Sequence, residues 1–347
     1  MEEVQHTIIP VDQLESFQVA PVSVLPVFIP LFQLFALLPP IPAFVLWSVL
    51  NLVGFILYMA FLLRRMKAPG WQMLVLLGLM TYPSFSNLYF GQINLLLMIC
   101  VGEFIRSASR EREFNAGLWL GGLLLKPQLL VLLVPVFLLQ RKWRLLGGFL
   151  LACAVALVGS LLLGGTGGLM GVTAMILQFS KGIPTNLPAY MMNWRMIGEQ
   201  LGGVLPPGIS WGAAVLGMIV TAGLALFMWR RPVETDSTKF LAIFTGTLAA
   251  TLVVTWHSHI HMAMVLLPAI LLLLSNKIFP EKLFDGWLYG LPLALLLLFY
   301  PLLFTDIIPY KPLALLTCLV MFFFNLVVLG WAWKYFYTHA EGKDPAN

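Results

Sequence analysis

Charged residues are scarce in this chain. Only 10% of the 347 residues are Asp, Glu, Lys or Arg, whereas 60% are hydrophobic, and the mean hydropathy is +0.91. A soluble globular domain has about 25% charged residues, so this composition excludes one and indicates a polytopic membrane protein. The length allows about ten spans of roughly 20 residues. A functional site would therefore be built from helix ends and the loops between them.

Cysteine is also nearly absent. Cys100, Cys153 and Cys318 lie inside apolar stretches, without a CxxC pattern or a His/Cys spacing. Disulfides and a zinc site of the usual kind are therefore not expected, and we interpret the cysteines as packing residues. We expect no metal and no cofactor.

The N-terminal segment has no basic residue. Residues 1–16 contain four acidic residues, no Lys or Arg, and no signal-peptide pattern, which favours an external location. Residues 17–40 are apolar but contain five prolines, each of which removes a backbone donor. Broken backbone at membrane depth is tolerated only against protein or a water-filled cavity. We predict a proline-broken juxtamembrane or re-entrant segment here, with a plain span as the alternative.

The basic residues follow successive apolar runs in short clusters. The positive-inside rule places all five clusters in the cytoplasm: residues 64–67, 106–113, 141–144, 230–231 and 277–282. A pI of about 9.1 thus reflects topology, and no nucleic-acid partner is expected. The predicted fold is an all-α polytopic membrane protein with about nine transmembrane helices, at residues 41–63, 71–89, 92–106, 145–165, 211–229, 239–256, 260–275, 285–304 and 313–333. Its parts are an extracytoplasmic tail and juxtamembrane segment (1–40), a transmembrane domain (41–335) and a cytoplasmic tail (336–347), with the longest external loop at 166–210.

Residues 114–140 conflict with simple alternation. Both ends lie beside cytoplasmic clusters, yet about 27 residues suffice for one crossing only. We predict a re-entrant hairpin of two half-length helices that meet at Lys126-Pro127-Gln128, because proline breaks the helix where the chain must turn. A charge deep in an apolar run is a functional-site hypothesis by default, and a lysine suits a phosphate. Snorkelling to the interface or pairing with a carboxylate is the alternative for Lys126.

Other polar residues lie on the same predicted side. Arg195, in Asn193-Trp194-Arg195, suits an anionic lipid headgroup, with interfacial anchoring by Trp194 as the alternative. Gly91 permits a tight turn in which the amides of Gln92 and Asn94 bind sugar hydroxyls or cap the next helix. Glu103, by contrast, lies three residues before Arg106 near the cytoplasmic end of its span, and the two are expected to neutralise each other.

Three histidines lie within five positions. On a helix His257 and His261 would share a face while His259 would point away, whereas in an extended segment all three would align. No acidic residue or cysteine lies nearby to complete a zinc site. We expect these histidines to hydrogen-bond or exchange a proton near a phosphate, with a structural polar cap as the alternative.

The order of these motifs resembles a known family. From about residue 19 to 274 the sequence resembles the pattern of glycosyltransferase family 87. The matching motifs are the proline-rich stretch, residues 89–96, the charged loop, residues 125–128, the 141–144 cluster and the histidine segment 256–268. The resemblance implies an integral-membrane GT-C enzyme of the plasma membrane that moves a hexose, mannose first among the options, from a polyprenyl-phosphate sugar to a glycolipid or glycan acceptor. It also implies extracytoplasmic chemistry with inversion at the anomeric carbon.

One feature departs from that pattern. Members of the family usually begin with a transmembrane helix and an external loop that carries a catalytic aspartate, and the chain as given starts after both. Asp12 lies closer to the proline-rich stretch than that aspartate should. The candidate catalytic residues are His257, His261, Asp306 and Asp12, and the candidate substrate-binding residues are Gln92, Asn94, Lys126, Gln128, Asn193, Trp194, Arg195 and His259.

Two other functions remain open at the level of sequence. A transporter or flippase of lipid-linked sugars would share the basic residues and broken helices, although the internal repeats typical of transporters are not evident. A non-catalytic remnant that binds lipid or a partner protein would explain the missing aspartate loop.

Overall fold

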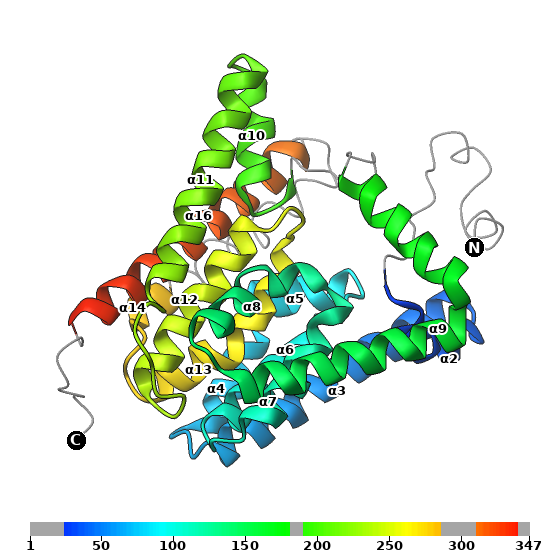
Figure 1. Cartoon of the computed structure of the whole chain (residues 1–347), viewed down its shortest axis with the longest axis horizontal. Coiled ribbons are helices and arrows are strands. Elements are labelled where there is room, and N and C mark those ends of the chain that lie inside the picture. Colours follow the sequence, from blue (N-terminus) through cyan, green and yellow to red (C-terminus); the bar gives the residue numbers. More distant parts are fainter. Residues whose placement is uncertain (1–23, 181–189, 286–309, 339–347) are drawn as a thin grey trace.

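The computed structural model describes residues 24–180, 190–285 and 310–338, and every regular element in these ranges is a helix (Figure 1). The first half contains η2 (Pro26–Phe28), α2 (Pro30–Ala36), α3 (Pro40–Arg65), α4 (Trp71–Leu79), α5 (Tyr82–Tyr89), α6 (Asn94–Ala108), α7 (Glu113–Gly121), η3 (Gly122–Leu125), η4 (Pro127–Leu129), α8 (Leu130–Leu139) and α9 (Trp143–Ser180). The second half contains α10 (Trp194–Gly202), α11 (Pro207–Phe227), α12 (Thr238–Val254), η6 (Ile260–Leu266), α13 (Leu267–Ser275), α14 (Glu281–Asp285) and α16 (Tyr310–Thr338). The protein is an all-α membrane protein.

Long apolar helices surround shorter buried ones. Four described helices are long and apolar enough to cross a membrane: α3, the stretch Trp143–Leu177 of α9, α11, and the stretch Leu315–Thr338 of α16. The shorter helices α12 and α13 and the turn η6 form the centre, and nearly all of their side chains are buried. Central helices contact protein on all sides, so they are not required to match the bilayer thickness as lipid-facing helices are.

Helices occupy most of the expected spans, although residues 260–275 divide into the 3₁₀ helix η6 and the α-helix α13. Three further differences follow. Residues 71–89 are not one helix, because Thr81 caps a new helix that carries Pro83 in its first turn. The described parts of residues 166–210 are not an open loop, because α9 continues beyond a kink at Gly165 (φ 60°) as far as Ser180 and α10 begins at Trp194. The span at 285–304 lies largely outside the described residues, and the count of nine stays a prediction. Proline does break the segment before Pro40, into the short helices η2 and α2.

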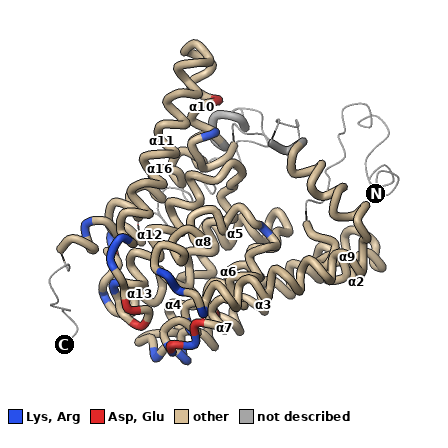
Figure 2. The backbone as a smooth tube through the Cα atoms, in the orientation of Figure 1, with Lys and Arg blue, Asp and Glu red and all other residues tan. Residues whose placement is uncertain are grey.

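The charged residues gather at one end of the bundle, around α4, α7 and α13 (Figure 2). Four helices end there with a charged residue in the left-handed conformation: Lys67, Glu111, Arg141 and Lys277. In each case the next N–H bonds the carbonyl five residues earlier, as in a Schellman motif. The side chain of Gln140 accepts from Val233 N at 3.2 Å and donates to Arg231 O at 2.7 Å, which joins two of the basic clusters.

The hairpin predicted at 114–140 is present. α7 and η3 run up to Lys126, whose extended backbone (φ −139°, ψ 79°) ends the first limb, and η4 and α8 return. The two ends of the segment meet in an ion pair of 2.8 Å between Glu113 and Lys142. Both ends therefore lie at the charged end of the bundle, and Lys126 lies at the tip.

Close helix packing supports this hairpin. α7 and α9 cross at glycines: a Cβ atom added at Gly117 would lie 1.9 Å from Leu145 O, and one at Gly148 would lie 2.0 Å from Phe114 O. Only residues without a side chain allow two backbones to approach so closely, as is common between membrane helices. The position of Lys126 thus depends on this contact.

Candidate functional site

The turn between α5 and α6 is the first part of the site. Gly91 has a φ of 57°, and Gln92 N donates to Asn87 O at 2.9 Å, which ends α5. The indole Nε1 of Trp47 donates to Gly91 O at 2.9 Å and so fixes the turn to α3. Glycine is favoured here by its positive φ and by the close approach of Phe44, whose ring would lie 3.1 Å from an added Cβ.

Lys126 contacts this turn from the tip of the hairpin. Its Nζ donates to Asn94 Oδ1 at 3.0 Å and to Gln92 Oε1 at 3.3 Å. In the part of the chain that the structure describes, no carboxylate lies within ion-pair distance of Lys126. Neutral amide oxygens hold the ammonium without cancelling its charge, so an anion can still bind there. Asn94 does not cap α6 with its side chain, which corrects one of the two roles expected for it.

The histidine segment lies between α12 and η6. Its backbone is extended at His259 (φ −110°, ψ 163°), and the ring centroids lie 4.7 Å apart for His257 and His259 and 5.5 Å apart for His259 and His261. The three rings therefore line up, as the extended alternative predicts. The helical alternative, with His259 pointing away, is wrong.

The tautomer of His259 follows from its partner. Its Nδ1 lies 3.2 Å from Tyr190 O, and a carbonyl oxygen can only accept, so Nδ1 carries the proton and Nε2 keeps a lone pair. Burial, aided by the Lys126 charge and opposed by the Tyr190 bond, lowers the pKa of His259 to about 4. Burial and the charges of His259, Lys126 and Arg195 lower the pKa of His257 to about 3. Both rings are neutral at pH 7.

The segment before α10 packs against the histidine loop. Met192 N donates to Ser258 O at 2.9 Å, and Asn193 Nδ2 donates to Thr255 O at 2.9 Å. Asn193 Oδ1 accepts from Met196 N at 3.1 Å, so this side chain caps α10. Asn193 is fully buried and its amide is occupied, which corrects the expectation that it binds substrate directly.

Trp194 lies against two other helices. Its Nε1 donates to Thr221 Oγ1 at 2.9 Å, and its ring packs edge-on against Phe322 at 5.0 Å. The half-buried indole thus contacts both α11 and α16, and its expected roles at the interface or against a sugar stay predictions. It acts as packing that holds α10 in place.

Arg195 is a buried cation that forms no ion pair within the described residues, although the Glu199 carboxylate, one helical turn later, acts on it electrostatically. The residue is only 3% exposed, and its guanidinium carbon lies 4.6 Å from the ring centroid of Trp256. Its Nε and Nη1 are buried and, within the described residues, donate no hydrogen bond. A buried charge is costly unless paired and hydrogen-bonded. Two free donors on a buried guanidinium fit an oxyanion such as a phosphate.

Hydrogen bonds join Lys126 to Gln92 and Asn94, and ring contacts join the three histidines. The charges of Lys126 and Arg195 both act on His257, which places the two groups near each other. Gln128 lies next to Lys126, but its side chain makes no hydrogen bond within the described ranges. Asp12 and Asp306 lie outside the described residues. In the described part of the chain, no group of three His, Cys, Asp or Glu residues could hold a metal ion.

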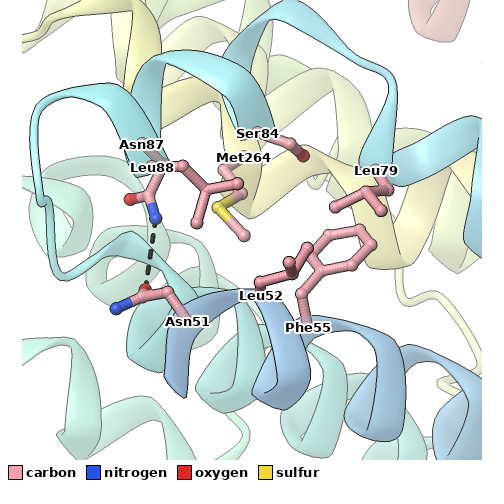
Figure 3. Close-up of a pocket in the computed structure, with 8 residues that line it drawn as sticks. All are labelled: Asn51, Leu52, Phe55, Leu79, Ser84, Asn87, Leu88 and Met264. Atoms are coloured by element: carbon pink, nitrogen blue, oxygen red, sulfur yellow. Dashed lines mark hydrogen bonds between the residues drawn. The ribbon is translucent and has the colours of Figure 1, made fainter. Parts of the chain in front are cut away.

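Sequence reasoning missed Asn51 and Asn87. Asn87 Nδ2 donates to Asn51 Oδ1 at 3.3 Å, and both are almost fully buried. The available signal was an asparagine in the middle of the apolar run 41–63. They line a small cavity of about 10 Å³ with Ser84, Met264 and apolar neighbours (Figure 3). That volume holds about one water molecule, so this cavity is not a sugar site.

Together these features define a helical membrane protein with two cations and three neutral histidines gathered away from its charged end. The chain belongs to glycosyltransferase family 87, whose sequence model matches residues 26–255. It is therefore a membrane glycosyltransferase, which sets aside the transporter alternative. The match includes Gln92, Lys126 and Arg195 and ends just before the histidine segment. No curated protein and no solved structure matches the chain.

Proposed function

We propose that the enzyme transfers a hexose, mannose first among the options, from a polyprenyl-phosphate sugar to a glycolipid or glycan acceptor. The single observation that supports this proposal is the pair of cations, Lys126 and Arg195, neither of which has a carboxylate within ion-pair distance among the described residues. Both charges lower the pKa of His257, so both lie near enough to this ring to act on it. A phosphate with a lipid tail would supply the anion that both cations lack.

The reaction follows from this charge distribution. An acceptor hydroxyl attacks the anomeric carbon as the bond from that carbon to the phosphate oxygen breaks, and the phosphate leaves with the electron pair. Lys126 and Arg195 stabilise the charge that develops on that oxygen. A phosphate is stable as an anion, so its departure needs no proton from a general acid, and the configuration at the anomeric carbon inverts.

A base must accept the proton of the acceptor hydroxyl. His259 suits this role because Tyr190 O fixes the proton on Nδ1 and leaves the Nε2 lone pair free. His257 and His261 lie beside it and complete the polar surface. Asp12 and Asp306 stay candidate bases.

The membrane side is part of the proposal. Basic clusters mark the cytoplasmic end, and Lys126 lies at the far tip of a hairpin whose two ends meet at that end. We place the reaction on the extracytoplasmic face of the plasma membrane, where a lipid-linked donor diffuses laterally and nucleotide sugars are not available.

The test is transfer from polyprenyl-phosphate mannose by the full chain in proteoliposomes. Lys126→Met should lower the rate by about 10²-fold, as expected for the loss of one preorganised charge donor, and Arg195→Met by about 10-fold or more. Lys239→Met is the matched control, since Lys239 contacts the Phe336 ring (4.8 Å) away from the site. Normal turnover in both site variants, or equal use of a nucleotide sugar, would overturn the proposal.

A further inference from the structure

A chain of asparagine side chains runs from Lys126 into the bundle. An ammonium group can only donate, so the oxygen of Asn94 must face Lys126 and the NH₂ group of Asn94 must face away. That NH₂ group donates to Asn87 Oδ1 at 3.0 Å, and the same oxygen accepts the backbone N–H of Asn94 at 3.1 Å. The orientation of one amide therefore fixes the next.

The series of hydrogen bonds continues from Asn87 in the same direction and returns to the turn at Gly91 through Trp47. Asn87 Nδ2 donates to Asn51 Oδ1 at 3.3 Å, as Figure 3 shows, and Asn51 Nδ2 donates to Trp47 O at 2.9 Å. Trp47 Nε1 in turn donates to Gly91 O at 2.9 Å, one residue before Gln92, the second acceptor of Lys126. Every donor in the chain points away from Lys126, and the last one returns to the turn that holds it.

The burial of these asparagines indicates that the hydrogen-bond series has a functional role besides local packing. Asn51, Asn87 and Asn94 are 4%, 1% and 0% exposed and belong to three different helices, α3, α5 and α6. Polar groups at such positions in a membrane protein are costly and cluster at functional sites. Alternative orientations of these amides would place two oxygens or two NH₂ groups face to face, so the network allows one arrangement only.

We propose that Asn87 and Asn51 are positioning residues that hold the Asn94 amide, and through it the Lys126 ammonium, in the orientation that binds the donor phosphate. This inference rests on the proposed function of Lys126. Neither asparagine touches substrate. Their effect on transfer is therefore transmitted through Lys126 and disappears when the lysine is absent.

A double-mutant cycle tests this directly. Asn87→Leu, which keeps the volume but removes both polar groups, should lower transfer by about 10-fold or more, since supporting residues of a site typically contribute 10- to 100-fold. In the Lys126→Met background the same substitution should change the residual rate by less than about twofold. Thr245→Val is the control, because Thr245 is equally buried and donates to Leu241 O at 2.7 Å, four residues earlier, as Asn51 does to Trp47 O.

Each outcome separates the two proposals. Loss in Asn87→Leu that vanishes without Lys126, with normal turnover in Thr245→Val, supports the positioning role. Equal losses with and without Lys126 would show that Asn87 only stabilises the fold, and unchanged transfer in Asn87→Leu would also overturn the inference. Normal turnover in Lys126→Met would instead overturn the proposed function. If Asn87→Leu is not recovered folded, the same cycle can be made with Asn51→Ser, because Asn51 is one hydrogen bond further from Lys126 than Asn87.

Discussion

The crossing of α7 and α9 provides a sharp test of how the hairpin positions Lys126. Gly147 and Gly148 are neighbours on α9, but a methyl group at Gly148 would lie 2.0 Å from Phe114 O and 3.1 Å from Leu118 N, whereas one at Gly147 meets no atom within 4 Å. The two substitutions Gly147→Ala and Gly148→Ala are therefore chemically identical and differ only in what they contact.

The size of the effect follows from these distances. A contact of 2.0 Å is roughly 1.5 Å shorter than an ordinary van der Waals contact, and the atoms it meets are backbone atoms that cannot rotate away. α7 must shift, at a cost of about 1–3 kcal/mol for overpacking. Because α7 continues through η3 to Lys126, a shift of about 1 Å at the tip should lower transfer by about 10²-fold.

The assay compares both variants by thermal unfolding in detergent and by transfer in proteoliposomes. Gly147→Ala should keep normal activity and stability, or gain slightly from the higher helix propensity of alanine. Gly148→Ala should lose both. Equal behaviour of the two variants would refute the inferred backbone contact and its role in placing Lys126.

Two further predictions concern topology and protonation. The topology is tested with single cysteines in a background without the three native ones. Val204→Cys should react with an impermeant thiol reagent in intact cells and Arg110→Cys only after lysis, because both positions are exposed and lie at opposite ends of the protein. The reverse labelling pattern would refute the orientation. The pKa values of about 3 and 4 for His257 and His259 predict that kcat/KM shows no step near pH 6.5 from these residues, because their neutral forms are lost only as pH falls towards 4. A step near pH 6.5 that His259→Ala removes, or activity that EDTA abolishes and zinc or manganese restores, would contradict this account.

The hairpin could be predicted from sequence because its signals are local. A charge and a proline interrupt an apolar run, and the run is too short for two crossings. Glu103 and Arg106 were likewise predictable, because residues three apart share a helix face, and their carboxylate and guanidinium do pair, at 2.8 Å from Arg106 Nε.

Tertiary contacts decided the features that the sequence did not reveal. The histidine segment is extended because the chain before α10 lies against it, with Met192 N bonded to Ser258 O. The bond from Trp194 to Thr221 joins residues 27 apart, which the sequence around Trp194 does not reveal. Asn51 and Asn87 are separated by 36 residues, and nothing in either helix alone predicts that their amides meet.

The central claim is that Lys126 and Arg195 bind the phosphate of a lipid-linked donor. The most direct measurement is inhibition of transfer by polyprenyl phosphate, compared with the uncharged polyprenol of equal length. The phosphate should inhibit the wild-type enzyme far more strongly than the alcohol, and Lys126→Met or Arg195→Met should weaken that inhibition by about 10-fold or more, as expected for one charged hydrogen bond. Equal inhibition by the two lipids, or inhibition by the phosphate that neither substitution changes, would contradict the claim.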